Sequence, residues 1–377
     1  MSKHIKHGKT TKANFGNFGR FEIALMGTPC SQIKKLSGIL TKHLQGLKIA
    51  YADADHHHHN SNTENNAPGM GSYLNFTDKI SYRQIDYSID FNRYQSNMLF
   101  NDCDLVLVNG NHFEASKQII VIDPRKPLNK KLHKITNPVM VLYLDTPFDQ
   151  PSYLKDHIAI DKVPIFKFDD YEKIAAKIRD MVQEEIPVLN GLILAGGKSL
   201  RMGRDKGLIE YFGKPHREHL YDMLTGKIKN VYYSIRPDQT NEFEKQPVIL
   251  DSFSGLGPFG ALLSAFREFP NDAWLVIATD LPLLTEKTID QLMNGRNPSK
   301  IATAFYNPET DFTEPLITIW EPKSYPVLLN FLSLGYSCPR KVLINSDIEV
   351  LKAENPDVLK NINDQESYEA ILRLLKK

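Results

Sequence analysis

Short runs of apolar residues alternate along the chain with segments in which apolar residues recur at helical spacing. In the first half, the run at 21–26 predicts a buried strand, and the apolar positions from Ile33 to Leu44 predict the helix that follows it. The same reasoning predicts further strands at 47–51, 104–108, 118–122 and 139–144, and a helix at 171–183. Such alternation is typical of α/β units built on mainly parallel sheets.

The second half shows the same alternation of strand-length and helix-period segments, but it is not a copy of the first half. Strands are predicted at 191–194, 231–235, 248–250 and 274–278, and a helix is predicted to begin near Phe259. We expect the segment 184–190 to be a linker. The 377 residues are long for a single domain, so we expect two α/β domains, 1–186 and 187–377.

Composition narrows the class of protein. Hydrophobic residues make up 41% and charged residues 24%, which is ordinary for a globular chain, and the net charge of +1 gives no bulk attraction to nucleic acid or to acidic membranes. Cys30, Cys103 and Cys338 lie far apart, which favours a reducing compartment. No apolar run approaches the ~20 residues that span a bilayer, and the basic first twenty residues lack the apolar stretch of a secretory signal. We therefore expect a cytoplasmic protein with no nucleic-acid or membrane partner.

The strand at 191–194 runs directly into a loop that is rich in glycine and in positive charge. Gly196, Gly197 and Gly203 allow the close backbone approach that a Cβ would block, and backbone N–H groups after a strand cradle anionic oxygens. The spacing is neither GxGxxG nor GxxxxGK[ST]; the alternative to a polyphosphate site is a solvated loop. The basic residues of the segment are Lys198, Arg201, Arg204 and Lys206.

Two aspartates follow predicted strands of the same half. Asp251 precedes the glycine-rich turn at 255–260, and Asp280 stands at the carboxyl end of the strand at 274–278, where open parallel sheets bind ligands. A carboxylate at that place suits Mg²⁺ shared with substrate phosphates. The alternative for Asp280 is a helix cap or a turn acid.

Taken together, LAGGKSLRMGRDKG, Asp251 with GPFG, TDLP and the NIND segment at 361–364 resemble the molybdenum cofactor guanylyltransferase (MobA) family. The resemblance covers nearly all of 191–377. It implies a Rossmann-like α/β nucleotidyltransferase fold, and transfer of GMP from MgGTP to molybdopterin with release of pyrophosphate. Mg²⁺ is then the cofactor, GTP a substrate, and molybdenum-cofactor insertion or acceptor proteins are candidate partners.

The resemblance also implies roles for individual residues. Lys206, Arg201 and Asp280 would be catalytic, with Asp280 holding the metal. At the position of Ser234 the family has an asparagine, so this sequence departs from the family pattern there. The nearby Arg236 is a candidate to make the asparagine's contact instead. The residues that would bind nucleotide or pterin are Leu194, Ala195, Gly196, Gly197, Lys206, Ser234, Asp251, Asp280, Asn361 and Asn363, with Arg340 and Lys341 as further candidates for the pterin phosphate.

The attacking phosphate of molybdopterin is already anionic near neutral pH, so the enzyme's task would be positioning and charge stabilisation. Two alternatives stay open. One is a different nucleotidyltransferase that uses CTP with molybdopterin, or a sugar phosphate. The other is a non-catalytic carrier of nucleotide or pterin.

In the first half, ALMGTPCSQIKKL follows a strand and opens a helix. It resembles the phosphate loop of MobB, a GTP-binding accessory protein of the same pathway, which implies a fold like that of P-loop NTPases. Pro29 and Cys30, however, replace the glycine and lysine that hold phosphates, so the loop is degenerate and nucleotide hydrolysis is not expected. The run His56–His59 is a candidate transition-metal site, with an exposed polar loop as the alternative.

Overall fold

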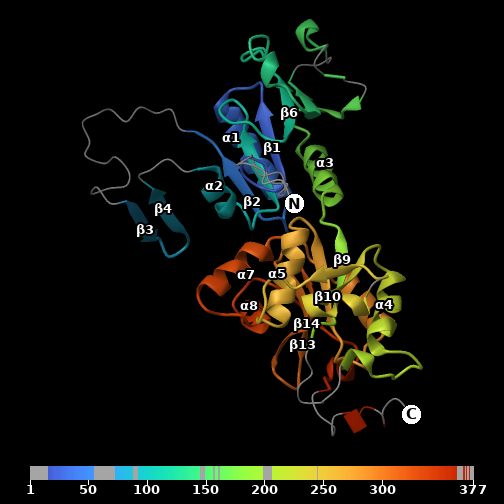
Figure 1. Cartoon of the computed structure of the whole chain (residues 1–377). Helices are drawn as coiled ribbons and strands as arrows, with labels where there is room; N and C mark the ends of the chain where they lie inside the picture. Colours follow the sequence, from blue (N-terminus) through green and yellow to red (C-terminus); the bar gives the residue numbers. More distant parts are fainter. Residues whose placement is uncertain are drawn as a thin grey trace, which may run out of the picture. The chain divides into compact units, whose positions relative to one another are not determined.

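The computed structural model describes residues 16–54, 73–87, 92–144, 149–155, 158–159, 162–197, 206–243 and 245–362, together with residues 368, 369, 371 and 373. The chain divides into two compact units (Figure 1). We call Phe15–Glu185 the N-terminal unit and Ile186–Lys377 the C-terminal unit. No helix among the described residues is long and apolar enough to cross a membrane.

The N-terminal unit is built on a six-stranded sheet whose strands are all parallel, in the order β2-β5-β1-β6-β7-β8. The strands are β1 (Glu22–Met26), β2 (Ile49–Ala52), β5 (Leu105–Asn109), β6 (Lys117–Ile122), β7 (Pro138–Tyr143) and β8 (Ile165–Lys167). The helices are α1 (Cys30–His43), α2 (Arg93–Leu99) and α3 (Tyr171–Glu184). Apolar side chains of α1 and α3 pack on one face of the sheet, in a cluster with Ile23, Leu107 and Ile119.

A separate two-stranded antiparallel sheet joins β3 (Leu74–Asp78) to β4 (Arg83–Tyr87). The pattern of apolar residues did not predict this hairpin or the short strand β8. The other strands and the two longer helices of this unit lie where they were predicted, within one to three residues at either end.

The C-terminal unit contains a seven-stranded mixed sheet in the order β11-β10-β9-β12-β14-β13-β15. Its strands are β9 (Leu189–Leu194), β10 (Val231–Ile235), β11 (Val248–Leu250), β12 (Ala273–Ala278), β13 (Ala302–Asn307), β14 (Phe312–Trp320) and β15 (Glu349–Lys352). Only β14 runs antiparallel to its neighbours β12 and β13 among the described pairings.

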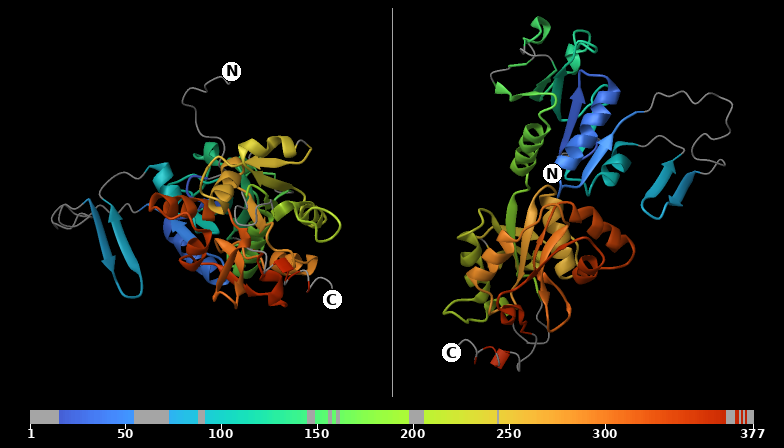
Figure 2. Two further views of the ribbon diagram at one scale, coloured as in Figure 1. Left: turned by 60° about the horizontal axis from the view of Figure 1, so that its bottom comes forward. Right: turned by 180° about the vertical axis from the view of Figure 1, so that it is seen from behind.

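Helices cover both faces of this sheet (Figures 1 and 2). Trp274 and Val276 of β12 face a cluster with α5, α7 and α8, whereas Leu275 and Ile277 face α4 and α6. This alternation is what a strand buried on both sides requires. The helices are α4 (His216–Thr225), α5 (Pro258–Glu268), α6 (Glu286–Asn294), α7 (Ser324–Ser333) and α8 (Pro339–Ile344).

The strand order reverses beside β9. The chain moves from β9 outward to β10 and β11, and then returns to place β12 on the other side of β9. Ligands of open α/β sheets bind at the carboxyl ends of strands at such a switch point. The fold class is therefore α/β with mainly parallel sheets, as the sequence pattern predicts.

One local expectation needs correction. The segment 184–190 was expected to be a linker, but β9 begins at Leu189, which pairs with Ala273. Asn190 is 1% exposed and donates from Nδ2 to Asp272 Oδ2 at 2.8 Å, so this end of the segment is part of the core. The sequence missed it because the apolar run of β9 is interrupted by Asn190 and Gly191.

The likeness of the N-terminal unit to P-loop proteins is not confirmed. A loop of GxxxxGK[ST] spacing that ended at Ser31 would include Leu25 and Met26. Both residues belong instead to β1, where Leu25 pairs with Asn109 and Ile119. Only Gly27, Thr28 and Pro29 then connect β1 to α1. A connection this short leaves no room for a phosphate cradle of that kind.

Candidate active site

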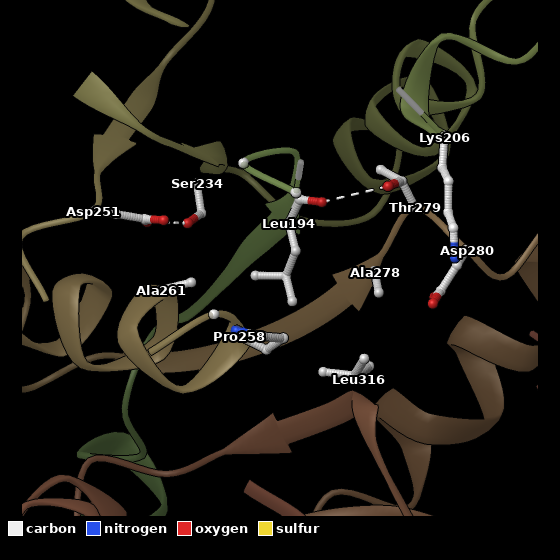
Figure 3. Close-up of a pocket in the computed structure, with 13 residues that line it drawn as sticks. Leu194, Lys206, Ser234, Asp251, Pro258, Ala261, Ala278, Thr279, Asp280 and Leu316 are labelled. Atoms are coloured by element: carbon white, nitrogen blue, oxygen red, sulfur yellow. Dashed lines mark hydrogen bonds between the residues drawn. The ribbon is translucent and has the colours of Figure 1, made fainter. Parts of the chain in front are cut away.

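A cavity of about 260 Å³ lies at the carboxyl ends of β9, β10 and β12 (Figure 3). Of the residues predicted to bind nucleotide, those that line it are Leu194, Gly196, Gly197, Lys206, Ser234, Asp251 and Asp280. Ala195 is 4% exposed and does not line the cavity; its backbone N–H donates to Ser234 O at 3.0 Å and holds β9 against β10.

At one end of the cavity, Ser234 and Asp251 form a hydrogen-bonded pair (Figure 3). Ser234 Oγ donates to Asp251 Oδ1 at 2.6 Å. Burial raises the pKa of Asp251 above its ordinary value, although the Ser234 hydroxyl and the Arg236 charge oppose the shift. Ser234 thus stabilises a neighbouring carboxylate.

Arg236 holds the glycine loop in place at the same end. Its Nη1 donates to Gly196 O, and its Nε donates to Asp238 Oδ1 at 3.0 Å. A Cβ added at Gly196 would stand 3.3 Å from Asp251 Oδ2, a tight contact. A Cβ at Gly197 would meet no described atom within 4 Å, so the space beside this residue is open to a ligand.

The N-terminus of α5 forms part of the cavity wall through Pro258 and Ala261. Gly257 precedes the helix with a φ of 55°, which favours glycine, and the first turn contains no acidic residue. A Cβ at Gly260 would lie 2.2 Å from Phe253 O, so the turn before the helix packs tightly on it. Backbone N–H groups and the helix dipole make this end of α5 attractive to anions.

At the other end of the cavity, the side chain of Lys206 extends toward Asp280 (Figure 3). Asp280 Oδ1 is shielded from solvent and has no hydrogen-bond partner among the described residues. Burial raises the pKa of Asp280, whereas the charge of Lys206 lowers it. A buried carboxylate oxygen without a partner is costly, and a cation beside it would relieve that cost.

Ile362, in the NIND segment, contacts both Lys206 and Asp280 through its backbone. Lys206 Nζ donates to Ile362 O, and Ile362 N–H donates to Asp280 O at 3.0 Å. Asn361 lies next to these contacts in sequence, and its Oδ1 is buried without a partner in the described part of the chain. Asp280 does not cap a helix, because the cap of α6 is Thr285.

Sequence reasoning missed Glu314 of β14, which is 2% exposed and raises the pKa of Asp280 by its charge. Its Oε1 accepts from Asn307 Nδ2 at 2.7 Å and lies 3.5 Å from Arg340 Nη2. The signal that could have revealed it is a charged residue within an otherwise apolar stretch of β14.

Lys341, predicted to bind the pterin phosphate, has its Nζ over the Tyr336 ring, 4.8 Å from the ring centroid.

Several predicted residues lie outside the described residues: Lys198, Arg201, Arg204, Asn363 and His56–His59. Within the described ranges, no group of three or more His, Cys, Asp or Glu side chains is arranged to hold a metal ion.

These features define a class. A glycine loop, a helix N-terminus, a lysine and a buried aspartate line one cavity at the switch point of an α/β sheet, an arrangement typical of sites that bind phosphates with a hard cation. Residues 191–348 match the family model of the MobA-like NTP transferase domain. This part of the C-terminal unit is therefore similar to MobA-like NTP transferase domains.

Curated relatives match about half of the chain. A molybdenum cofactor biosynthesis bifunctional protein from Synechocystis sp. is 34% identical over 182 residues, which cover 48% of this chain and 52% of the relative. The chain therefore matches only about half the length of that relative. A molybdenum cofactor guanylyltransferase from Shewanella putrefaciens is 29% identical, and the alignment covers 47% of this chain and 93% of that protein.

Among solved structures, the molybdopterin-guanine dinucleotide biosynthesis protein A from Archaeoglobus fulgidus is similar, with 18% identity and a TM-score of 0.43. That similarity covers 50% of this chain and 98% of the other.

Proposed function

We propose that the C-terminal unit transfers GMP from MgGTP to molybdopterin, giving molybdopterin guanine dinucleotide and pyrophosphate. The observation that carries the proposal is the buried Oδ1 of Asp280, which has no hydrogen-bond partner among the described residues and lies beside Lys206, on a cavity that the glycine loop and the start of α5 also line. The names of the relatives from Synechocystis and Shewanella agree with this reaction.

The two ends of the cavity suit the two parts of a nucleotide. Asp251, supported by Ser234, would accept hydrogen bonds from the nucleoside. Gly196, Gly197 and the first turn of α5 would bind phosphate oxygens through backbone N–H groups. Lys206 would neutralise phosphate charge next to Asp280.

Mg²⁺ fits the residues at the second end. Its ligands in phosphate-transfer sites are one or two carboxylates together with substrate oxygens, and Asp280 offers an oxygen that no described group satisfies. Bound there, Mg²⁺ would supply charge stabilisation for the phosphates. Because burial raises the pKa of Asp280, a cation would also favour the ionised carboxylate.

The reaction needs no strong base. An anionic phosphate oxygen of molybdopterin attacks the α-phosphorus of GTP, one P–O bond forms, and the bond to the leaving pyrophosphate breaks. The chain's own contribution is to align the two phosphates and to stabilise the charge that develops, through Lys206 and the N-terminus of α5. Asn361, buried beside Ile362, would contact the pterin substrate.

We further propose that 1–186 and 187–377 act as separable domains in the cytoplasm, and that cofactor-insertion or acceptor proteins receive the product. A truncated protein beginning near Pro187 contains every cavity residue named above. It should retain GMP transfer at saturating free molybdopterin. If the truncated protein is folded but inactive, the first domain completes the site and the separation is wrong.

The deciding experiment supplies the full chain with Mg²⁺, molybdopterin and either GTP, CTP or a sugar phosphate with a nucleoside triphosphate. We expect pyrophosphate release with GTP and molybdopterin, and formation of the dinucleotide by mass spectrometry. Release only with CTP, or only with a sugar phosphate, would assign a different nucleotidyltransferase. Stoichiometric binding without turnover would assign a carrier.

A further inference from the structure

Three side chains of the N-terminal unit place nitrogen atoms around the sulfur of Cys30. His112 Nε2 lies 3.3 Å from Cys30 Sγ, Asn111 Nδ2 lies 3.5 Å away and Lys126 Nζ lies 3.8 Å away. Cys30 is itself partly exposed, so a small molecule can reach it. None of these residues belongs to the site proposed for GMP transfer.

The cluster occupies the ligand-binding edge of the parallel sheet. Cys30 follows β1, Asn111 and His112 follow β5, and Lys126 follows β6, so the groups come from the carboxyl ends of three neighbouring strands. Cys30 is also the first residue of the 14-residue helix α1, which has no side-chain cap and no acid in its first turn. The sulfur therefore lies beside the positive end of a helix dipole and beside the Lys126 ammonium group.

A carboxylate lies close to the histidine. Asp53 Oδ1 lies 3.8 Å from His112 Nε2 and accepts from Asn109 Nδ2 at 2.7 Å. Its other oxygen accepts from Tyr51 OH at 2.6 Å. The Asp53 carboxylate is therefore fixed from two sides and stabilises a positive charge on His112.

A second, independent feature indicates a ligand. Asn111 is 9% exposed, its Nδ2 donates to Thr28 O at 3.0 Å, and its Oδ1 is buried with no partner in the described part of the chain. A buried acceptor without a donor is unfavourable. An amide N–H of a bound peptide-like molecule would satisfy it, and Lys126 would attract a carboxylate of the same molecule.

We propose that Cys30 is a thiol–disulfide exchange site for a small peptide disulfide that carries carboxylates. The thiol proton passes to His112 Nε2 and Cys30 Sγ attacks one sulfur of the disulfide. The S–S bond breaks, and the departing thiolate takes the proton from His112. Cys30 is oxidised to a mixed disulfide while one half of the ligand is reduced to a thiol, and excess thiol reverses the step.

The other two cysteines serve as internal controls. Cys103 packs against the apolar cluster that includes Ala24, Ala52 and Val106. Cys338 is exposed, immediately before α8. Accessibility alone therefore predicts that Cys338 reacts first, whereas the Cys30 site predicts the opposite order.

The test treats the full chain with glutathione disulfide at about pH 6.5, well below the ordinary thiol pKa of about 8.5, and follows each cysteine by peptide mass spectrometry. We expect Cys30 to react about threefold to tenfold faster than Cys338, because His112 Nε2 can accept the thiol proton as Sγ attacks and the Lys126 ammonium group attracts the carboxylates of glutathione disulfide. His112→Gln should remove this advantage at Cys30 and leave the rate at Cys338 unchanged. His133→Gln, a change at an exposed histidine of the same unit, should alter neither rate.

Charge recognition is tested with Lys126→Met. This variant should slow the reaction of Cys30 with glutathione disulfide more than its reaction with neutral hydroxyethyl disulfide, and Lys130→Met should not. Equal or slower reaction of Cys30 than of Cys338 in the unmodified protein would overturn the proposal, whether or not the variants fold. A folded His112→Gln protein with an unchanged Cys30 rate would overturn it as well.

Discussion

Two aspartates occupy corresponding places in the two units but differ in their hydrogen-bond partners. Asp123 follows β6, next to β1, and Asp280 follows the end of β12, next to β9. Asp123 accepts from Thr28 Oγ1 at 2.5 Å and from Arg125 Nη2 at 2.7 Å. Asp280 Oδ1 is buried without a partner among the described residues.

The pKa shifts follow from these contacts. Burial pushes the pKa of Asp123 upward, but hydrogen bonds from Arg125 and Thr28 outweigh it and hold the pKa below its ordinary value. Burial dominates at Asp280, and the pKa is raised. A carboxylate at the carboxyl end of a parallel strand thus marks a ligand site only when the protein leaves it unsatisfied. Asp123 links two loops through Thr28 and Arg125, whereas Asp280 keeps a buried oxygen that no described residue satisfies, as the proposed metal site requires.

Exchanging each aspartate for asparagine should give the largest contrast. Asp280→Asn removes the charge that would hold Mg²⁺, so GMP transfer should fall by at least about 100-fold, the usual effect of deleting a main electrostatic contribution. Asp123→Asn should leave transfer within about twofold, while lowering the free energy of unfolding by about 1.5–3 kcal/mol through weakened hydrogen bonds to a charged group. Pyrophosphate release and urea unfolding measure the two effects.

The same pair differs in pH dependence. A raised pKa in the folded state means that stability declines as pH rises above the ordinary aspartate pKa of about 4, because ionising Asp280 is harder in the folded protein. Asp280→Asn should therefore raise the Tm near neutral pH. Asp123, with a lowered pKa, stabilises the fold above that value and loses this effect on acidification. Parallel Tm profiles for the two variants would contradict the comparison.

Substituting a lysine inside the cavity and one outside it should give the next largest difference in activity. Lys206→Met should reduce kcat/KM for GTP by about 10–100-fold, since a cation beside the phosphates is lost. Lys214→Met is the matched control, because this lysine pairs with Asp222 away from the cavity. Its kcat/KM should stay within about twofold of the unmodified protein. Equal losses in the two variants would indicate a general charge effect.

The two glycine loops should also respond differently. A Cβ at Gly27 would lie 2.3 Å from Val121 O, at a φ of 93°, so Gly27→Ala should destabilise the N-terminal unit and leave GMP transfer unchanged. At Gly197 a Cβ meets no atom of the described residues within 4 Å, so Gly197→Ala should preserve the Tm while raising the KM for GTP by about threefold to tenfold. Thermal unfolding and steady-state kinetics distinguish the two. An unchanged KM in Gly197→Ala would place the phosphates elsewhere.

The smallest effect is expected at Ser234→Ala. Losing one hydrogen bond to Asp251 should raise the KM for GTP by about twofold to fivefold. Because the Ser234 hydroxyl lowers the pKa of Asp251, its removal lets that pKa rise further. The KM should then begin to increase at a higher pH on acidification than in the unmodified protein. A pH profile of KM that does not move would separate Ser234 from nucleotide binding.

Much of the fold followed from the sequence because buried parallel strands are continuous apolar runs. The strands β10 and β11 were predicted at their observed bounds. The hairpin β13–β14 was not, since β14 includes Glu314 and Pro315, which interrupt an apolar pattern. The partner of Glu314 is Asn307 on the neighbouring strand, and only the folded chain brings the two together.

The candidate site also contains some residues that the sequence predicted and others that it did not. Asp251 and Asp280 were visible because carboxylates after strands have a positional meaning. The contribution of Ile362 was not, because it acts through its backbone N–H and carbonyl, and no residue type signals such a contact. The difference between Asp123 and Asp280 was equally hidden, since it depends on which neighbours reach each carboxylate.

The contacts of Ile362 bear on the order in which this unit assembles. Lys206 and Ile362 are 156 positions apart in sequence, and the same isoleucine also holds the backbone of Asp280. Closing so long a loop is slow compared with forming local contacts. During synthesis, the sheet from β9 to β14 has left the ribosome well before Ile362 emerges. The contacts of Ile362 with Lys206 and Asp280 therefore form late in folding, and GMP transfer should appear only after they have formed.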